Sequence, residues 1–127
     1  MLANFESTFG TVFTNHSIHT LSTGNSIQDG CLACQIKTYS QTDVLVGLHG
    51  AGMTNMVFMP PGSLVVEIVG KFDGRMLPLC GYHSSLAAMY GHHHFLYYYD
   101  WKDTQEAINA LDIAQQVVNF YHSLVKT

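Results

Sequence analysis

The chain contains few charged residues, and basic residues are the scarcest. Only 11% of its 127 residues are charged and Lys plus Arg number five, whereas about a quarter of the residues are charged in an ordinary soluble domain. The formal net charge of -4 is opposite to what binding to a phosphate backbone requires, so we expect no nucleic-acid partner. The low charge and the 47% hydrophobic content also indicate that part of the surface meets another protein part.

Long apolar runs are lacking as well. No stretch approaches the roughly 18 to 20 apolar residues that cross a bilayer. The N-terminal residues MLANFESTFG contain no basic region followed by an apolar core. We therefore expect neither a signal peptide nor a membrane anchor within this sequence, whose length suits one domain.

Cysteine is also rare. Cys31, Cys34 and Cys80 are too few for a disulfide scaffold. The C-x-x-C pair of Cys31 and Cys34 would suit a redox site if it lay at a helix N-terminus after a strand, and a zinc site if two further ligands joined it. We favour a third interpretation, in which both are small residues on a half-buried helix.

Hydrophobic patterning predicts alternating strands and helices. Residues 44–48 and 64–69 are apolar runs typical of strands covered on both faces. Only residues 51–59 lie between them, so the connecting helix must be short, and Pro60, Pro61 and Gly62 end it. The expected elements are a strand at 10–14, a loop at 15–29, a helix at 30–40, a strand at 44–48, a helix at 51–59, a strand at 64–69, a helix at 79–90 ended by Gly91, a strand at 95–99, and a helix from a capping box at 103–106 to the C-terminus. This alternation predicts an α/β fold with a parallel sheet.

A glycine-rich turn follows the first of these apolar strands. Residues 45–55 read LVGLHGAGMTN, so a strand leads into a helix whose first amides have no acceptor within the helix. Gly50 and Gly52 permit positive φ and let an anion approach the backbone, and Thr54 and Asn55 add donors. The order G-x-x-G-x-G and the missing P-loop lysine favour neither NAD nor ATP. The turn predicts a phosphate site at the carboxyl end of a strand; tight packing of the turn is the alternative.

The segment 43–67, DVLVGLHGAGMTNMVFMPPGSLVVE, resembles the signature of glycosyltransferase family 61. The resemblance is specific across this segment and looser beyond it. Met53 stands where the family usually has Leu, a substitution that conserves volume.

The resemblance implies a GT-B architecture of two Rossmann-like halves. This chain would be the C-terminal half, a single parallel-sheet, Rossmann-like, nucleotide-sugar-binding domain over residues 1–127. The family transfers a sugar with inversion from a nucleotide sugar, such as a UDP-sugar, to a glycan or glycoprotein acceptor, and we expect the whole protein in the lumen of the Golgi or endoplasmic reticulum. The N-terminal half would be a missing partner domain, and the chain a fragment.

Inverting transfer requires that the departing diphosphate be stabilised and the acceptor hydroxyl deprotonated. Glu67, an acid in an apolar strand, would accept from ribose hydroxyls. His49 either donates to the donor or braces the turn, and it is the only candidate for a catalytic role; the catalytic base stays unknown. The residues expected to bind the donor are His49, Gly50, Ala51, Gly52, Met53, Thr54, Asn55 and Glu67.

A D-x-D motif is absent from the sequence, so we expect transfer without a metal ion or other cofactor. Of the adjacent His92, His93 and His94, only His92 and His94 would share one face of a strand, and two ligands do not make a metal site. Two other functions stay open. One is a non-catalytic module that binds a nucleotide sugar or phosphate, and the other is a metal protein that uses the histidines and cysteines.

Overall fold

The computed structural model describes residues 2–13, 31–72, 75–76, 81–100 and 110–125. Contacts divide the chain into two compact units, one formed by Met1–Leu21 with Lys102–Thr127 and the other by Ser22–Trp101. The described residues of the first unit are helical, and the second unit contains the sheet. That the chain forms a single domain over residues 1–127 stays a prediction.

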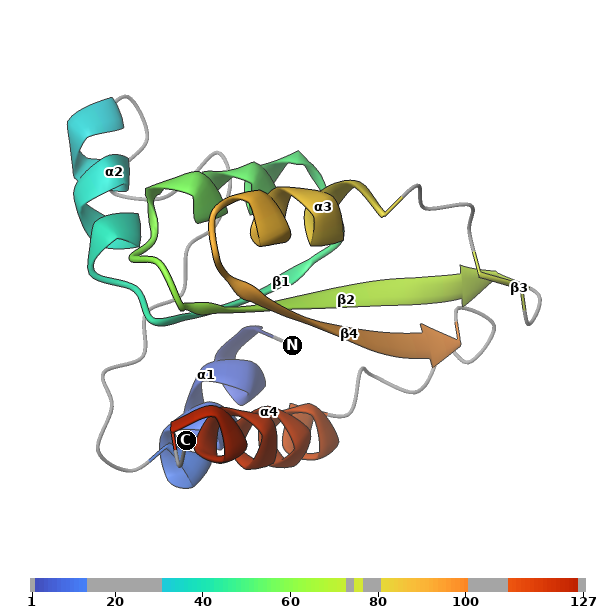
Figure 1. Cartoon of the computed structure of the whole chain (residues 1–127). Coiled ribbons are helices and arrows are strands. Elements are labelled where there is room, and N and C mark those ends of the chain that lie inside the picture. The colour runs from blue at the N-terminus through green and yellow to red at the C-terminus, as the bar shows by residue number, and fades with distance from the viewer. Residues whose placement is uncertain (1, 14–30, 73–74, 77–80, 101–109, 126–127) are drawn as a thin grey trace. The chain divides into compact units, whose positions relative to one another are not determined.

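The second unit is built on a parallel sheet (Figure 1). Its central strand β2 (Leu64–Phe72) pairs in parallel with β1 (Val44–Leu48) on one edge and with β4 (His93–Asp100) on the other. A short strand β3 (Arg75–Met76), which the sequence did not predict, pairs antiparallel with the end of β2. These strands confirm the predicted α/β fold with a parallel sheet, which is compatible with a Rossmann-like unit.

The helices of this unit follow the predicted order. They are α2 (Leu32–Ser40), the short 3-10 helix η1 (Ala51–Phe58) and α3 (Tyr82–Met89). η1 packs against β1, α2 and α3, and α3 also packs against β4. Figure 1 shows η1 and α3 on the same side of the sheet, so these two helices cover one of its faces.

Proline and glycine end these helices where the sequence predicted. Gly62 turns the chain from η1 into β2 with φ 86°, a left-handed conformation that favours glycine. Gly91 has φ 75° and its N–H donates to the carbonyl of Ala88 at 3.2 Å, which closes α3. Gly47 has a packing role instead, because a Cβ there would lie 2.7 Å from Sδ of Met53.

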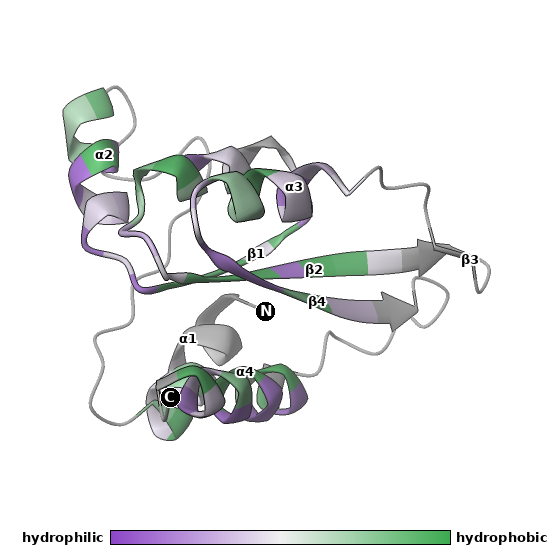
Figure 2. Cartoon of the chain, viewed as in Figure 1, coloured by the Kyte–Doolittle hydropathy of each residue, from purple (hydrophilic) through white to green (hydrophobic). Residues whose placement is uncertain are grey.

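The strand β2 forms the core of the unit. Its residues on both faces are buried, namely Leu64, Val65, Val66, Ile68 and Val69. Figure 2 shows β2 largely green with a short purple stretch, and the charged residue within this apolar run is Glu67, which is only 4% exposed. A carboxylate buried in this way has to be paired.

The helical unit corrects one prediction. Its described helices are α1 (Leu2–Val12) and α4 (Ala110–Val125), which pack together, so the strand expected at residues 10–14 is wrong. Phe9 and Phe13 stack with ring centroids 6.0 Å apart, and Phe13 also meets the edge of Tyr121 in α4. Aromatic contacts at helical spacing override the β propensity of the short run that contains Phe13.

The helix α4 confirms the predicted C-terminal helix from residue 110 onward. Figure 2 shows green and purple sides along it. The expected capping box at 103–106 and loop at 15–29 lie outside the described residues. Among the described helices, none could span a bilayer. The residues that α4 buries are Ile113, Ala114, Val117 and Val118, at the spacing of one helix face.

The structure also corrects the interpretation of the cysteines. Cys31 and Cys34 form a disulfide at the start of α2. Cys31 is the N-cap of this helix, and its Sγ accepts the N–H of Cys34 at 3.1 Å. The disulfide therefore joins the first turn of α2 to its N-cap residue. The two cysteines are not merely small side chains on a half-buried helix face.

Candidate functional site

The strand register brings polar side chains to one face of the sheet. Gly47 of β1 pairs with Glu67 of β2, and paired residues in a parallel sheet point to the same side. His49 lies two residues after Gly47, and its N–H continues the ladder to β2 at 2.9 Å, so it faces that side as well. His94 of β4 pairs with Val65, two residues before Glu67, and shares the face.

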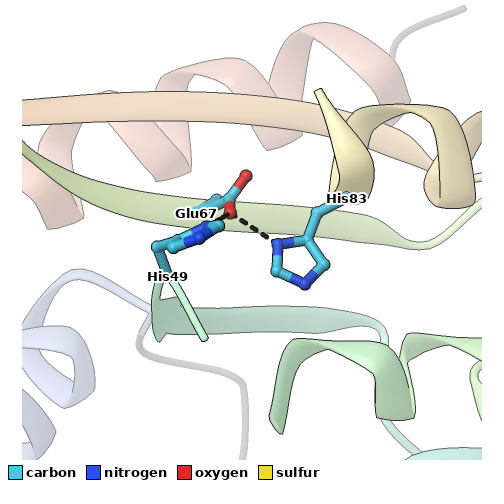
Figure 3. A group of neighbouring side chains, drawn as sticks. All are labelled: His49, Glu67 and His83. Carbon is cyan, nitrogen blue, oxygen red and sulfur yellow. Dashed lines mark hydrogen bonds and ion pairs between the residues drawn. The ribbon is translucent and has the colours of Figure 1, made fainter. Parts of the chain in front are cut away.

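Glu67 is bonded to three histidines from three different elements. Its Oε2 accepts from Nδ1 of His49, just after β1, and from Nδ1 of His83 in α3, the latter at 2.6 Å. Its Oε1 accepts from Nε2 of His94 at 2.9 Å. Figure 3 shows His49 and His83 directed at the same carboxylate. We name Glu67, His49, His83 and His94 the Glu67 cluster.

The Glu67 cluster is open to solvent mainly at one member. The exposed fraction of the side chain is 5% for Glu67, 3% for His83 and 10% for His94, but 37% for His49. Burial alone would raise the pKa of Glu67, but the hydrogen bonds from the three histidines outweigh burial and hold that pKa below its usual range. The carboxylate is therefore ionised at neutral pH, and His49 is the member that a ligand reaches most easily.

Ionisation of Glu67 fixes which ring nitrogens carry protons. An ionised carboxylate only accepts, so each histidine donates to it. His49 consequently carries a proton on Nδ1, which leaves Nε2 for a ligand. The ring of His83 lies edge-on to that of His49, with centroids 5.1 Å apart. A partly exposed imidazole held by a buried carboxylate is suited to anion binding or proton transfer.

The loop after β1 presents backbone amides beside His49. The first hydrogen bond of η1 runs from the N–H of Met53 to the carbonyl of Gly50 at 3.1 Å. The amides of residues 50–52 precede this bond, so the helix itself provides no acceptor for them. They lie at the carboxyl end of β1, the edge where open α/β sheets bind ligands.

Gly50 does not use the positive φ that glycine permits. Its backbone is extended, with φ 166° and ψ 175°, a conformation open to any residue. A Cβ at this position would meet only the carbonyl oxygen of Leu48, at 3.9 Å, which is ordinary contact. The advantage of glycine here is therefore open space above the backbone, and the conformational part of the expectation is corrected.

The remaining residues expected to bind the donor lie on η1. The amide of Met53 is used within the helix, and the residue is only 3% exposed. Nδ2 of Asn55 donates to the carbonyl of Gly52 at 3.0 Å, and the side chain of Asn55 also forms a hydrogen bond with Tyr39. Burial raises the pKa of Tyr39. Thr54 is half-buried. Ligand binding by all these residues stays a prediction, but the structure leaves residues 49–52 the freest to contact an anion.

Three members of the Glu67 cluster match the ligand types of a zinc site. One atom each from His49, Glu67 and His83 lie within 4.8 Å of one another. Two atoms bound to one tetrahedral zinc at about 2.1 Å stand about 3.4 Å apart, whereas Nδ1 of His83 and Oε2 of Glu67 are 2.6 Å apart. This is the spacing of a direct hydrogen bond, and a shared ion would require the cluster to open.

The neighbouring histidines do not converge on one point. His94 bonds to Glu67, whereas the buried His92 donates from Nε2 to the carbonyl of Met56 at 2.8 Å. His92 thereby ties η1 to the start of β4, and His93 is exposed. His92 and His94 therefore have separate roles in the structure.

Sequence reasoning found His49 and Glu67 but missed their partners. The signal for His94 is strand alternation, which places it on the face of Glu67 once the register of β4 against β2 is known. His83 lies on α3, and no pattern in the sequence gives the rotation of that helix about its axis. A buried acid in an apolar strand is the cue that such partners exist.

Comparison with known proteins finds a similarity to one family. Residues 26–66 match the family model described as Glycosyltransferase 61. The EGF domain-specific O-linked N-acetylglucosamine transferase of Rattus norvegicus is 31% identical over 68 residues, which are 54% of this chain and 11% of that protein. The Bos taurus protein of the same name is 37% identical over 41 residues, 32% of this chain and 8% of that protein.

A plant protein also matches. Alpha-1,3-arabinosyltransferase XAT2 of Oryza sativa subsp. japonica is 46% identical over 33 residues, 26% of this chain and 6% of that protein. The matched stretches thus span about a tenth or less of the curated relatives. The family match includes β1, His49 and the loop after it. Together these matches confirm the resemblance of this chain to glycosyltransferase family 61, which rests on residues 26–66.

Proposed function

We propose that this chain binds the nucleotide-sugar donor of an inverting glycosyltransferase, with the donor diphosphate at residues 49–52. The observation that carries the proposal is the loop itself, where amides without helical acceptors follow a parallel strand beside a partly exposed histidine. This loop lies within the segment that matches the family. Such amides and the positive end of a helix favour a doubly charged group such as a diphosphate.

The chemistry assigned to the site is stabilisation of the leaving group. During inverting transfer the acceptor oxygen gives up its proton to a base and forms a bond to the anomeric carbon. The bond from that carbon to the diphosphate oxygen breaks, and the departing oxygen keeps the electron pair. Donors already aimed at this oxygen lower the barrier. We assign this role to the amides of residues 50–52 and to His49, with UDP as the leaving nucleotide and no metal ion required.

Acceptor and compartment are proposed for the whole protein. The relatives named above act, by their names, on EGF domains or transfer arabinose, which supports a glycan or glycoprotein acceptor. The disulfide of Cys31 and Cys34 supports an oxidising compartment such as the lumen of the Golgi or endoplasmic reticulum. A further domain would complete the acceptor cleft.

Calorimetric titration of the purified chain with UDP, UDP-sugars and uridine tests the proposal. We expect saturable binding of UDP that is much tighter than that of uridine, because the diphosphate supplies most of the polar contacts. Absence of saturable UDP binding would refute the donor site. Binding of UDP-sugars without transfer, when the chain is supplied within its whole protein together with acceptor glycans, would favour the non-catalytic binding module instead.

A further inference from the structure

We propose that Glu67 is a positioning residue that acts on the donor only through His49. In this arrangement the buried carboxylate, fixed by His83 and His94, holds His49 with Nδ1 inward, so that Nε2–H donates to the diphosphate. The inference rests on the proposed diphosphate site. It replaces a direct contact of Glu67 with the ribose by an indirect contact with the phosphates.

The occupancy of the carboxylate argues against direct contact. Its two oxygens offer about four lone-pair sites, and three of these are taken by His49, His83 and His94. The side chain of Glu67 is only 5% exposed. Because the carboxylate is enclosed, a ribose hydroxyl could reach the remaining lone-pair site only by moving one of these histidines aside, which would leave a buried ring N–H unpaired.

Exposure assigns different roles to the three histidines. His83 and His94, at 3% and 10% side-chain exposure, come from α3 and β4 and are enclosed with the carboxylate. His49, at 37%, directly precedes Gly50 at the start of the amide loop. His83 and His94 therefore orient Glu67, and His49 connects it to the ligand.

The charges of the cluster support the same assignment. Among the described residues, the titratable groups bonded to Glu67 are His49 after β1, His83 on α3 and His94 on β4. One carboxylate compensates one imidazolium. Donation from Nε2–H to a diphosphate requires the imidazolium form of His49, and the carboxylate bonded to Nδ1 together with the bound diphosphate would compensate that charge. His49 is the member whose ring is exposed enough to meet the donor.

Comparison of UDP, pyrophosphate and uridine as calorimetric ligands distinguishes the two roles of Glu67. If Glu67 acts through His49, Glu67→Gln should lower the affinities for UDP and for pyrophosphate by the same factor. The factor is about 10-fold or more, as expected for the loss of one charged hydrogen bond. Uridine affinity stays unchanged. Lower affinities for UDP and uridine, with the affinity for pyrophosphate unchanged, would show that Glu67 contacts the ribose and would overturn the inference.

A double-mutant cycle tests the path of the effect. Because both residues act along one path, Glu67→Gln combined with His49→Gln should bind pyrophosphate about as weakly as His49→Gln alone. Full additivity of the two effects would overturn the inference. His93→Gln, which removes an exposed imidazole from the same sheet, is the matched control and should leave binding unchanged.

A measurement without ligand separates the inference from the proposed function. In ¹⁵N-histidine NMR of the free chain, Nδ1 of His49 should be protonated and hydrogen-bonded, and this signature should vanish in Glu67→Gln. An unprotonated Nδ1, or stoichiometric zinc in the purified chain, would overturn the inference while leaving the diphosphate site standing. Failure of both UDP and pyrophosphate to bind would overturn the proposed function and this inference with it.

Discussion

Replacement of Gly50 by alanine should separate ligand binding from folding. The backbone there is extended, and the added Cβ would meet only the carbonyl oxygen of Leu48 at 3.9 Å. Since neither strain nor a clash opposes the change, the smaller entropy of the unfolded chain should leave stability unchanged or raise it by up to about 1 kcal/mol. The methyl group would, however, occupy the open space through which an anion approaches the amides.

The expected loss of affinity follows from the bonds that the methyl group obstructs. A hydrogen bond to a charged group is worth about 1.5–3 kcal/mol, so the loss of one amide contact should raise the Kd for UDP by about 10- to 150-fold. Calorimetry with UDP measures the binding change, and urea unfolding of the same protein measures stability.

Gly62→Ala is the matched control for this experiment. Gly62 has φ 86° with nothing within 4 Å of an added Cβ, so alanine there is strained without being crowded. It should lower the free energy of unfolding by about 1–2 kcal/mol and leave UDP affinity unchanged. If Gly50→Ala bound UDP as tightly as the unmodified chain, the assignment of the diphosphate to this loop would be wrong.

Three further predictions concern the surroundings of the site. His92→Leu removes the donor to a buried carbonyl and should lower the free energy of unfolding in urea by about 1–3 kcal/mol. His93→Leu, at an exposed position, should change it by less than about 0.5 kcal/mol. Equal changes in the two variants would contradict the assigned role of His92. Gly47→Ala forces a Cβ against Sδ of Met53 at 2.7 Å and should cost about 1–3 kcal/mol, with a less than additive effect when combined with Met53→Ala. Because the folded-state pKa of Glu67 is lowered, its stabilisation is present above the unfolded pKa of about 4.3 and is lost as pH falls through the folded value. The difference in unfolding free energy between the unmodified chain and Glu67→Gln should therefore shrink below about pH 4. A difference that stays constant from pH 3 to 7 would exclude stabilisation by the ionised carboxylate of Glu67.

Features that depend on neighbours in the sequence were predictable. The apolar runs at 44–48 and 64–69, separated by too few residues for a long helix, led to parallel strands with a short crossover, and the structure has both. Gly91 ended its helix as expected. In each case the local sequence pattern and the tertiary packing favour the same conformation, so the local pattern predicts the observed structure.

Features that depend on distant contacts were not predictable. The run at residues 10–14 has the composition of a strand. Contacts of Phe13 with Phe9 and Tyr121 favour a helix there instead, and Tyr121 lies near the other end of the chain. Likewise, the sequence shows Glu67 as an acid in an apolar run without showing that His83 and His94 meet it. Those contacts require the register of β4 and the rotation of α3, which only the assembled sheet fixes.

The sharing of one carboxylate by three imidazoles also limits how this gene can diverge. If Glu67 alone were replaced by an apolar residue, His49 and the enclosed His83 and His94 would lose their common acceptor at once, and no single second substitution would restore all three bonds. A viable lineage that loses the acid must therefore alter positions 49, 83 and 94 along with it. These four positions should be inherited as a unit, while mutations accumulate freely at exposed positions such as Leu111 and Met89.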